Sequence, residues 1–159
     1  MTQPAVFSAI AATCAAVAAG INAYIGYQNR NDALDKQVYD SLTKKADESN
    51  SLVIKNNHQI PLETGKSGDV SRIYTLIQHS MKDIDRLNKR YGLLLNVDKI
   101  KRKNIKKKDE FKNYFFDLLH SSIWIDLKEQ GAEKTYSSKI LNEQIQDIKK
   151  FYKSQIYSK

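Results

Sequence analysis

The chain has 159 residues, a formal net charge of +8, one cysteine, two prolines and six glycines. This length suffices for one domain beside a short anchoring segment, and the shortage of chain-breaking residues favours helices over a turn-rich β-sandwich. The single cysteine excludes an intrachain disulfide and a cysteine metal cluster.

The first 29 residues carry no charged side chain, and Arg30 is the first charged residue. About 20 consecutive apolar residues in a helix are needed to cross a bilayer, so residues 1–29 are predicted to be a transmembrane anchor. Tyr24 and Tyr27 stand where an aromatic belt would meet the lipid headgroups. Two alternatives stay open because the segment is rich in small residues: a cleaved signal peptide, and a soluble helix buried in an oligomer.

The flanks of this segment predict its orientation. No lysine or arginine precedes the apolar run, whereas the residues that follow it include Arg30, Lys36, Lys44 and Lys45. The positive-inside rule therefore places the N-terminus outside and the larger C-terminal part in the cytoplasm. We expect a single-pass protein of a bacterial inner membrane.

Small residues recur at every fourth position along the predicted anchor. In lipid this spacing lets helix backbones approach closely, so it predicts a membrane helix association surface. Chance spacing within an alanine-rich segment is the competing interpretation. The candidate association residues are Ser8, Ala12, Ala16 and Gly20.

Residues 30–50 are predicted to form a juxtamembrane helix that continues the anchor. Leu34, Val38 and Leu42 are spaced by four residues, as one face of an amphipathic helix requires. Residues 51–68 contain Pro61 and two glycines and are predicted to be a loop.

Residues 69–159 are predicted to form a helical cytoplasmic domain. Apolar residues from Val70 to Leu94 recur at intervals of three and four, which indicates an amphipathic helix. This pattern suits either a bundle core or an intermolecular coiled coil. A second helix, with an aromatic face, is predicted around Phe111 to Leu119.

A last helix is predicted from about Ser137. Between these helices, residues 123–125 (Ile-Trp-Ile) fit either a helix continuation or a short buried strand. The fold class is therefore predicted to be all-α: a single N-terminal transmembrane helix followed by a small helical bundle-like cytoplasmic domain.

A basic run stands out from an otherwise nearly balanced chain. Residues 30–98 hold 11 basic and 10 acidic residues, whereas residues 99–108 hold seven basic and no acidic residues. We predict a basic loop at 97–108 that binds anionic lipid or an acidic partner. A nucleic-acid phosphate backbone and a solvated loop without a ligand are the other interpretations. The candidate residues are Lys99, Lys101, Arg102, Lys103, Lys106, Lys107 and Lys108.

No catalytic or metal-binding motif is found. The three histidines (His58, His79 and His120) lack the spacing of metal ligands, since only Asp83 stands near His79. Neither a nucleophile elbow nor a glycine-rich dinucleotide turn is present. We therefore expect no cofactor, no metal and no enzymatic activity.

These observations favour a membrane-tethered, non-enzymatic helical interaction module, such as a scaffold, sensor or accessory protein of an inner-membrane complex. Its expected partners are the lipid bilayer and either another protein or further copies of the chain; nucleic acid is not expected. Two alternatives stay open. One is a membrane-active effector that acts by oligomerisation of its anchor. The other is a membrane-attached nucleic-acid binder that uses residues 99–108.

Overall fold

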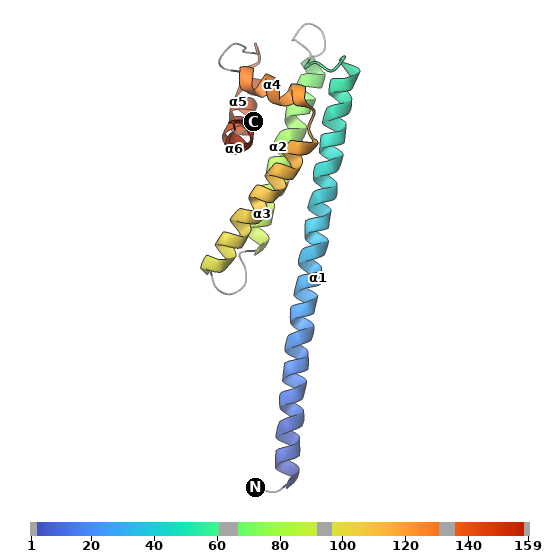
Figure 1. The fold of residues 1–159 in the computed structure, drawn as a ribbon, viewed down its shortest axis with the longest axis vertical. Helices are drawn as coiled ribbons and strands as arrows, with labels where there is room; N and C mark the ends of the chain where they lie inside the picture. The colour runs from blue at the N-terminus through green and yellow to red at the C-terminus, as the bar shows by residue number, and fades with distance from the viewer. Residues whose placement is uncertain (1–2, 61–66, 92–96, 131–135, 158–159) are drawn as a thin grey trace. The chain divides into compact units, whose positions relative to one another are not determined.

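A computed structural model describes the backbone of residues 3–60, 67–91, 97–130 and 136–157, and the side chains of residues 7–60, 68–86, 105–130 and 136–157. The described part is all-α and contains no β-strand, as predicted (Figure 1). The chain divides into an N-terminal unit, residues 1–37, and a helical domain, residues 38–159. The first helix, α1 (Gln3–Lys55), contributes residues to both.

The N-terminal unit consists of the first part of α1. Its many alanines have the highest helix propensity, which favours an unbroken helix. Every described side chain from Phe7 to Arg30 is exposed, including large apolar ones such as Phe7, with 71% of its surface exposed. Among the described residues, α1 alone is long and apolar enough to cross a membrane.

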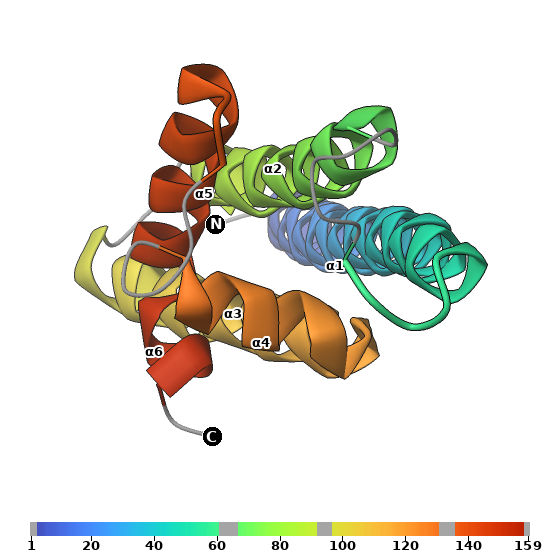
Figure 2. The same ribbon diagram turned by 90° about the horizontal axis from the view of Figure 1, so that it is seen from above.

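The helical domain contains the C-terminal part of α1 and five further helices. The two longer ones are α2 (Ser67–Tyr91) and α3 (Val97–Leu118). Three shorter helices follow: α4 (Ser121–Glu129), α5 (Lys139–Phe151) and α6 (Lys153–Tyr157). Figure 2 shows how these helices surround a common interior, with α5 crossing beside α2.

A single cluster of buried apolar side chains forms the core of this domain. The apolar face of α2 is buried within it, as the bundle interpretation of the periodicity predicts. At the corner between α3 and α4, the ring of Trp124 stacks on Phe116 with centroids 3.9 Å apart, and its indole N–H donates to the Phe116 carbonyl. The fully buried core residues of largest volume include Tyr74, Phe111, Phe115, Ile123 and Tyr152.

The structure differs from the sequence-based expectations in three segments and decides between the two alternatives for a fourth. Residues 97–108 belong to α3, so the predicted basic loop was wrong. The predicted loop at 51–68 is shorter, because α1 continues to Lys55 and α2 begins at Ser67. Residues 123–125, for which a helix continuation and a short strand were both open, are helical. The expected last helix is divided at Tyr152 into α5 and α6.

Polar contacts fix the C-terminal part of α1 against α2 and α3. Asp83 of α2 accepts hydrogen bonds from Ser41 and Lys45. Burial on its own raises the pKa of Asp83, but the hydrogen bonds and the positive charge of Lys45 outweigh it and lower this pKa below its ordinary value. On the α3 side, the hydroxyls of Thr43 and Tyr114 lie 2.8 Å apart.

Candidate functional sites

The predicted association stripe on the anchor is fully exposed in the chain. Ser8, Ala12, Ala16 and Gly20 all lie within α1 at the same helical spacing, and each is exposed. A Cβ atom added at Gly20 would meet no atom within 4 Å, its chain neighbours and the nearby backbone of its own helix aside. Association through this exposed surface stays a prediction.

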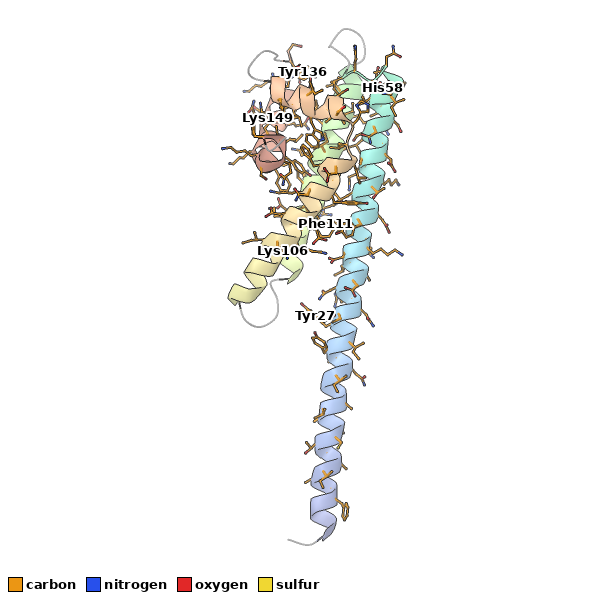
Figure 3. The ribbon with its side chains drawn as sticks, in the orientation of Figure 1. Tyr27, His58, Lys106, Phe111, Tyr136 and Lys149 are labelled. Atoms are coloured by element: carbon orange, nitrogen blue, oxygen red, sulfur yellow. The ribbon has the colours of Figure 1, made fainter. Side chains whose placement is uncertain are left out.

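The basic run lies on α3, where the structure describes three of its cations. Lys106 is exposed (labelled in Figure 3), whereas Lys107 and Lys108 are half-buried. Lys107 pairs with Glu110 at 3.2 Å and lies 5.4 Å from the centroid of the Phe111 ring. The side chains of the other predicted site residues, Lys99, Lys101, Arg102 and Lys103, lie outside the described residues.

Lys107 and Lys108 thus form contacts with other residues of the helical domain. Lys108 pairs with Asp85 of α2 and places its ammonium 4.8 Å from the centroid of the Phe151 ring. Such contacts hold a lysine stem against apolar surface. Of the three lysines of the run whose side chains the structure describes, Lys106 is the one without such a contact to the rest of the domain. These three side chains therefore do not form a uniformly solvated basic surface.

Two histidines far apart in the sequence meet where α1 and α3 end. His58 lies just after α1 in the left-handed region, with φ of 61°, and its carbonyl accepts a hydrogen bond from the Ser122 hydroxyl at 2.6 Å (Figure 3). His120 is the N-cap of α4, since its Nδ1 accepts from the Ser122 backbone N–H. His58 Nδ1 and His120 Nε2 are 3.2 Å apart.

This histidine pair is poorly suited to metal binding. Because Nδ1 of His120 accepts a backbone N–H, a neutral His120 ring carries its hydrogen on Nε2, which then donates to His58. The lone pair that would bind a metal is therefore missing from Nε2. No group of three or more metal-ligating side chains occurs among the described residues.

A pocket of about 330 Å³ lies beside His58, and its lining includes a buried carboxylate. Asp126 is 5% exposed and accepts hydrogen bonds from the hydroxyls of Tyr74 and Tyr136 and from the Gln130 amide. Burial raises the pKa of Tyr74 well above its ordinary value, and the charge of Asp126 raises it further. Tyr74 is therefore a protonated donor at neutral pH, and the side chains of Tyr74, Tyr136 and Gln130 hold the carboxylate of Asp126 in place.

Sequence reasoning missed both of these arrangements. His58 and His120 are 62 positions apart, and Tyr74 and Asp126 are 52 positions apart. No local spacing pattern in the sequence therefore predicts either contact. One signal was present for Asp126: a carboxylate directly after the apolar residues 123–125 and before Leu127. A charge within an apolar stretch requires buried hydrogen-bond donors.

Comparison with known proteins assigns no activity to these sites. No protein-family model matches the chain, and no similar curated protein or solved structure was found.

Proposed function

We propose that this chain is a single-pass, membrane-tethered interaction module without enzymatic activity. One observation carries the proposal: the described side chains from Phe7 to Gln28 are uncharged and all exposed, while the helical domain buries its own apolar residues in one core. An apolar surface of this extent requires lipid or another protein to cover it.

In this proposal the chain lies in a bacterial inner membrane with its N-terminus outside. The basic residues that follow the apolar segment, from Arg30 onward, support a cytoplasmic helical domain. The domain presents its surface to a protein partner, or to the same domain in another copy of the chain.

Membrane attachment is tested with the full chain, tagged at its C-terminus and expressed in bacteria. The double variant Val17→Lys with Ile21→Lys places two charges within the anchor, each costing about 2.5–3.5 kcal/mol at the centre of a membrane helix. The control is Ile54→Lys, which is also an exposed apolar position but lies in the helical domain. We expect the wild type and the control to stay in the membrane pellet after an alkaline carbonate wash and the double variant to be released. Equal distribution of all three proteins would contradict the proposal.

Orientation is tested by adding protease to intact spheroplasts. The C-terminal tag should be resistant until the membrane is permeabilised, and cleavage in intact spheroplasts would contradict the cytoplasmic placement.

Interaction is tested separately, by chemical cross-linking in the membrane followed by purification in mild detergent. Self-association through small residues predicts that Ala16→Leu with Gly20→Leu lowers the yield of cross-linked dimer, because leucine side chains separate the helix backbones. The control Ile21→Leu keeps the bulk of an already large side chain and should leave the yield unchanged. Unchanged dimer in both variants would exclude this stripe as the association surface.

A further inference from the structure

A second basic region becomes visible only in the folded domain, where α3, α5 and α6 meet. These helices line a pocket of about 570 Å³, whose size lies within the range of small-molecule sites. Three of its lining residues are lysines from three different helices: Lys112, Lys150 and Lys153. The other described lining residues are Phe151, Ser154 and Tyr157.

Among the described residues that line this pocket with the three lysines, none is acidic. None of the three ammonium groups forms an ion pair with a carboxylate in the part of the chain that the structure describes. This distinguishes them from Lys107 and Lys108 of the basic run, which pair with Glu110 and Asp85. The described lining of the pocket therefore carries positive charges that no described carboxylate pairs with. Lys150 and Lys153 are exposed, and Lys112 is half-buried.

The aromatic ring of Phe151 brings two of the domain's cations together. The ammonium of Lys112 lies 4.3 Å and that of Lys108 lies 4.8 Å from its centroid. Burial lowers the pKa of Lys112 below its ordinary value, and repulsion by Lys108 lowers it further, although Asp109 and Asp85 act in the opposite direction. An anion in the pocket would relieve both effects, because it offsets the desolvation and the repulsion of the charged form.

The apolar part of the pocket limits the kind of anion that it fits. Phe151 is half-buried, and the Tyr157 side chain has 62% of its surface exposed. Lysines from three helices beside one pocket suit a multiply charged phosphate, which lysine binds as a point charge. The neighbouring aromatic surface suits an apolar or aromatic group attached to that phosphate.

We infer that Lys112, Lys150 and Lys153, together with the rings of Phe151 and Tyr157, form a binding site for a phosphate group joined to an apolar or aromatic moiety. Such a ligand comes either from a soluble organic phosphate or from an anionic phospholipid headgroup. The inference does not depend on membrane attachment, because all residues of the site belong to the helical domain.

The test uses the full chain purified in a neutral detergent. Phenyl phosphate is the soluble probe, measured by titration calorimetry, and phosphatidylglycerol in mixed micelles is the lipid probe. Inorganic phosphate and phenol are measured as control compounds, because each contains only one of the two groups that the site is expected to bind. We expect saturable binding of phenyl phosphate, of phosphatidylglycerol or of both, with a higher affinity than that of inorganic phosphate or phenol.

The variant Lys112→Gln with Lys150→Gln and Lys153→Gln removes the three charges. The matched control, Lys44→Gln with Lys128→Gln and Lys139→Gln, removes three exposed charges elsewhere. Affinity should fall about tenfold or more in the first variant only, because it loses every charge-assisted contact to the phosphate. Far-ultraviolet circular dichroism and the fluorescence of Trp124 check that both variants are folded.

If the first variant fails to fold, Lys153→Gln alone serves instead, because that side chain is exposed and outside the core. It should weaken binding about threefold while the fold is unchanged. Binding of phenyl phosphate alone identifies a soluble ligand, and binding of phosphatidylglycerol alone identifies a lipid headgroup; either result supports the site. Equal losses in the site and control variants would refute the site, and so would binding of a DNA oligonucleotide in place of both probes.

Discussion

The buried carboxylate of Asp126 leads to a quantitative prediction about the stability of the helical domain. Tyr74 is fully buried, and its hydroxyl donates to this carboxylate. The variant Tyr74→Phe leaves the ring and its packing in place and removes one hydrogen bond to a buried charge. Hydrogen bonds to charged groups contribute about 1.5–3 kcal/mol, and water has poor access to replace this one.

The chain offers a matched control for this substitution. Tyr39 also donates its hydroxyl to a carboxylate, that of Glu110, at 2.6 Å. Glu110 is exposed, so water replaces the lost donor in Tyr39→Phe, and the expected loss is below about 1 kcal/mol. For a domain of this size, about 1.5–3 kcal/mol corresponds to a fall in Tm of roughly 5–12 °C.

The single tryptophan provides the assay. Trp124 is buried at the corner between α3 and α4, so its fluorescence follows the unfolding of the helical domain. The full chain in mild detergent is unfolded with urea, and the free energies of unfolding of the two variants are compared with that of the wild type. Equal losses in Tyr74→Phe and Tyr39→Phe would refute the argument that burial sets the strength of the contact.

Three further predictions use the same assay. The pKa of Asp83 is lowered in the folded state, so its ion pair with Lys45 stabilises the protein above the unfolded pKa of about 3.9, and this stability is lost as the pH falls through the lower folded pKa. Between about pH 6 and pH 3, Asp83→Asn should therefore lose less stability than the wild type. An equal loss in both proteins would contradict this linkage. Burial raises the pKa of Tyr152, so its contribution is present below about pH 10 and lost at higher pH; Tyr152→Phe should show a shallower alkaline decline, and an unchanged decline would count against it. Because His120 caps α4 through the Ser122 N–H, His120→Asn should be more stable than His120→Ala by about 1 kcal/mol, and equal stability of the two would show that the cap contributes nothing.

Local periodicity was sufficient to predict some of the helices but not others. The apolar residues of α2 recur at intervals that only a helix places on one face, and these residues form part of the core. The beginning of α3 lacks such a pattern, and its charges were interpreted as a loop. Lysine is nevertheless a good helix former, so charge density alone does not end a helix. The division at Tyr152 occurs without glycine or proline, at a residue whose side chain is fully buried in the core.

The candidate sites could not be predicted from the sequence for a related reason: local patterns do not show which residues meet in the folded domain. A run of neighbouring lysines is conspicuous in a sequence, yet two of the three cations of that run that the structure describes are paired with carboxylates of the domain. The pocket lysines are separated along the chain, since Lys112 precedes Lys150 by 38 positions, and only the packing of α3 against α5 and α6 brings them together. Their neighbours in sequence include Asp109 and Asp147, which makes each lysine look ordinary.

The density of positive charge along the sequence therefore does not show how much of that charge lacks a carboxylate partner in the folded protein. A lysine that already pairs with a carboxylate, as Lys108 does with Asp85, has little attraction left for a ligand. Desolvated lysines without a carboxylate partner, such as Lys112, gain most from an incoming anion. It follows that substituting the conspicuous run and substituting the pocket should have unequal effects on phosphate binding, with the larger effect at the pocket, even though the run contains more positive charges.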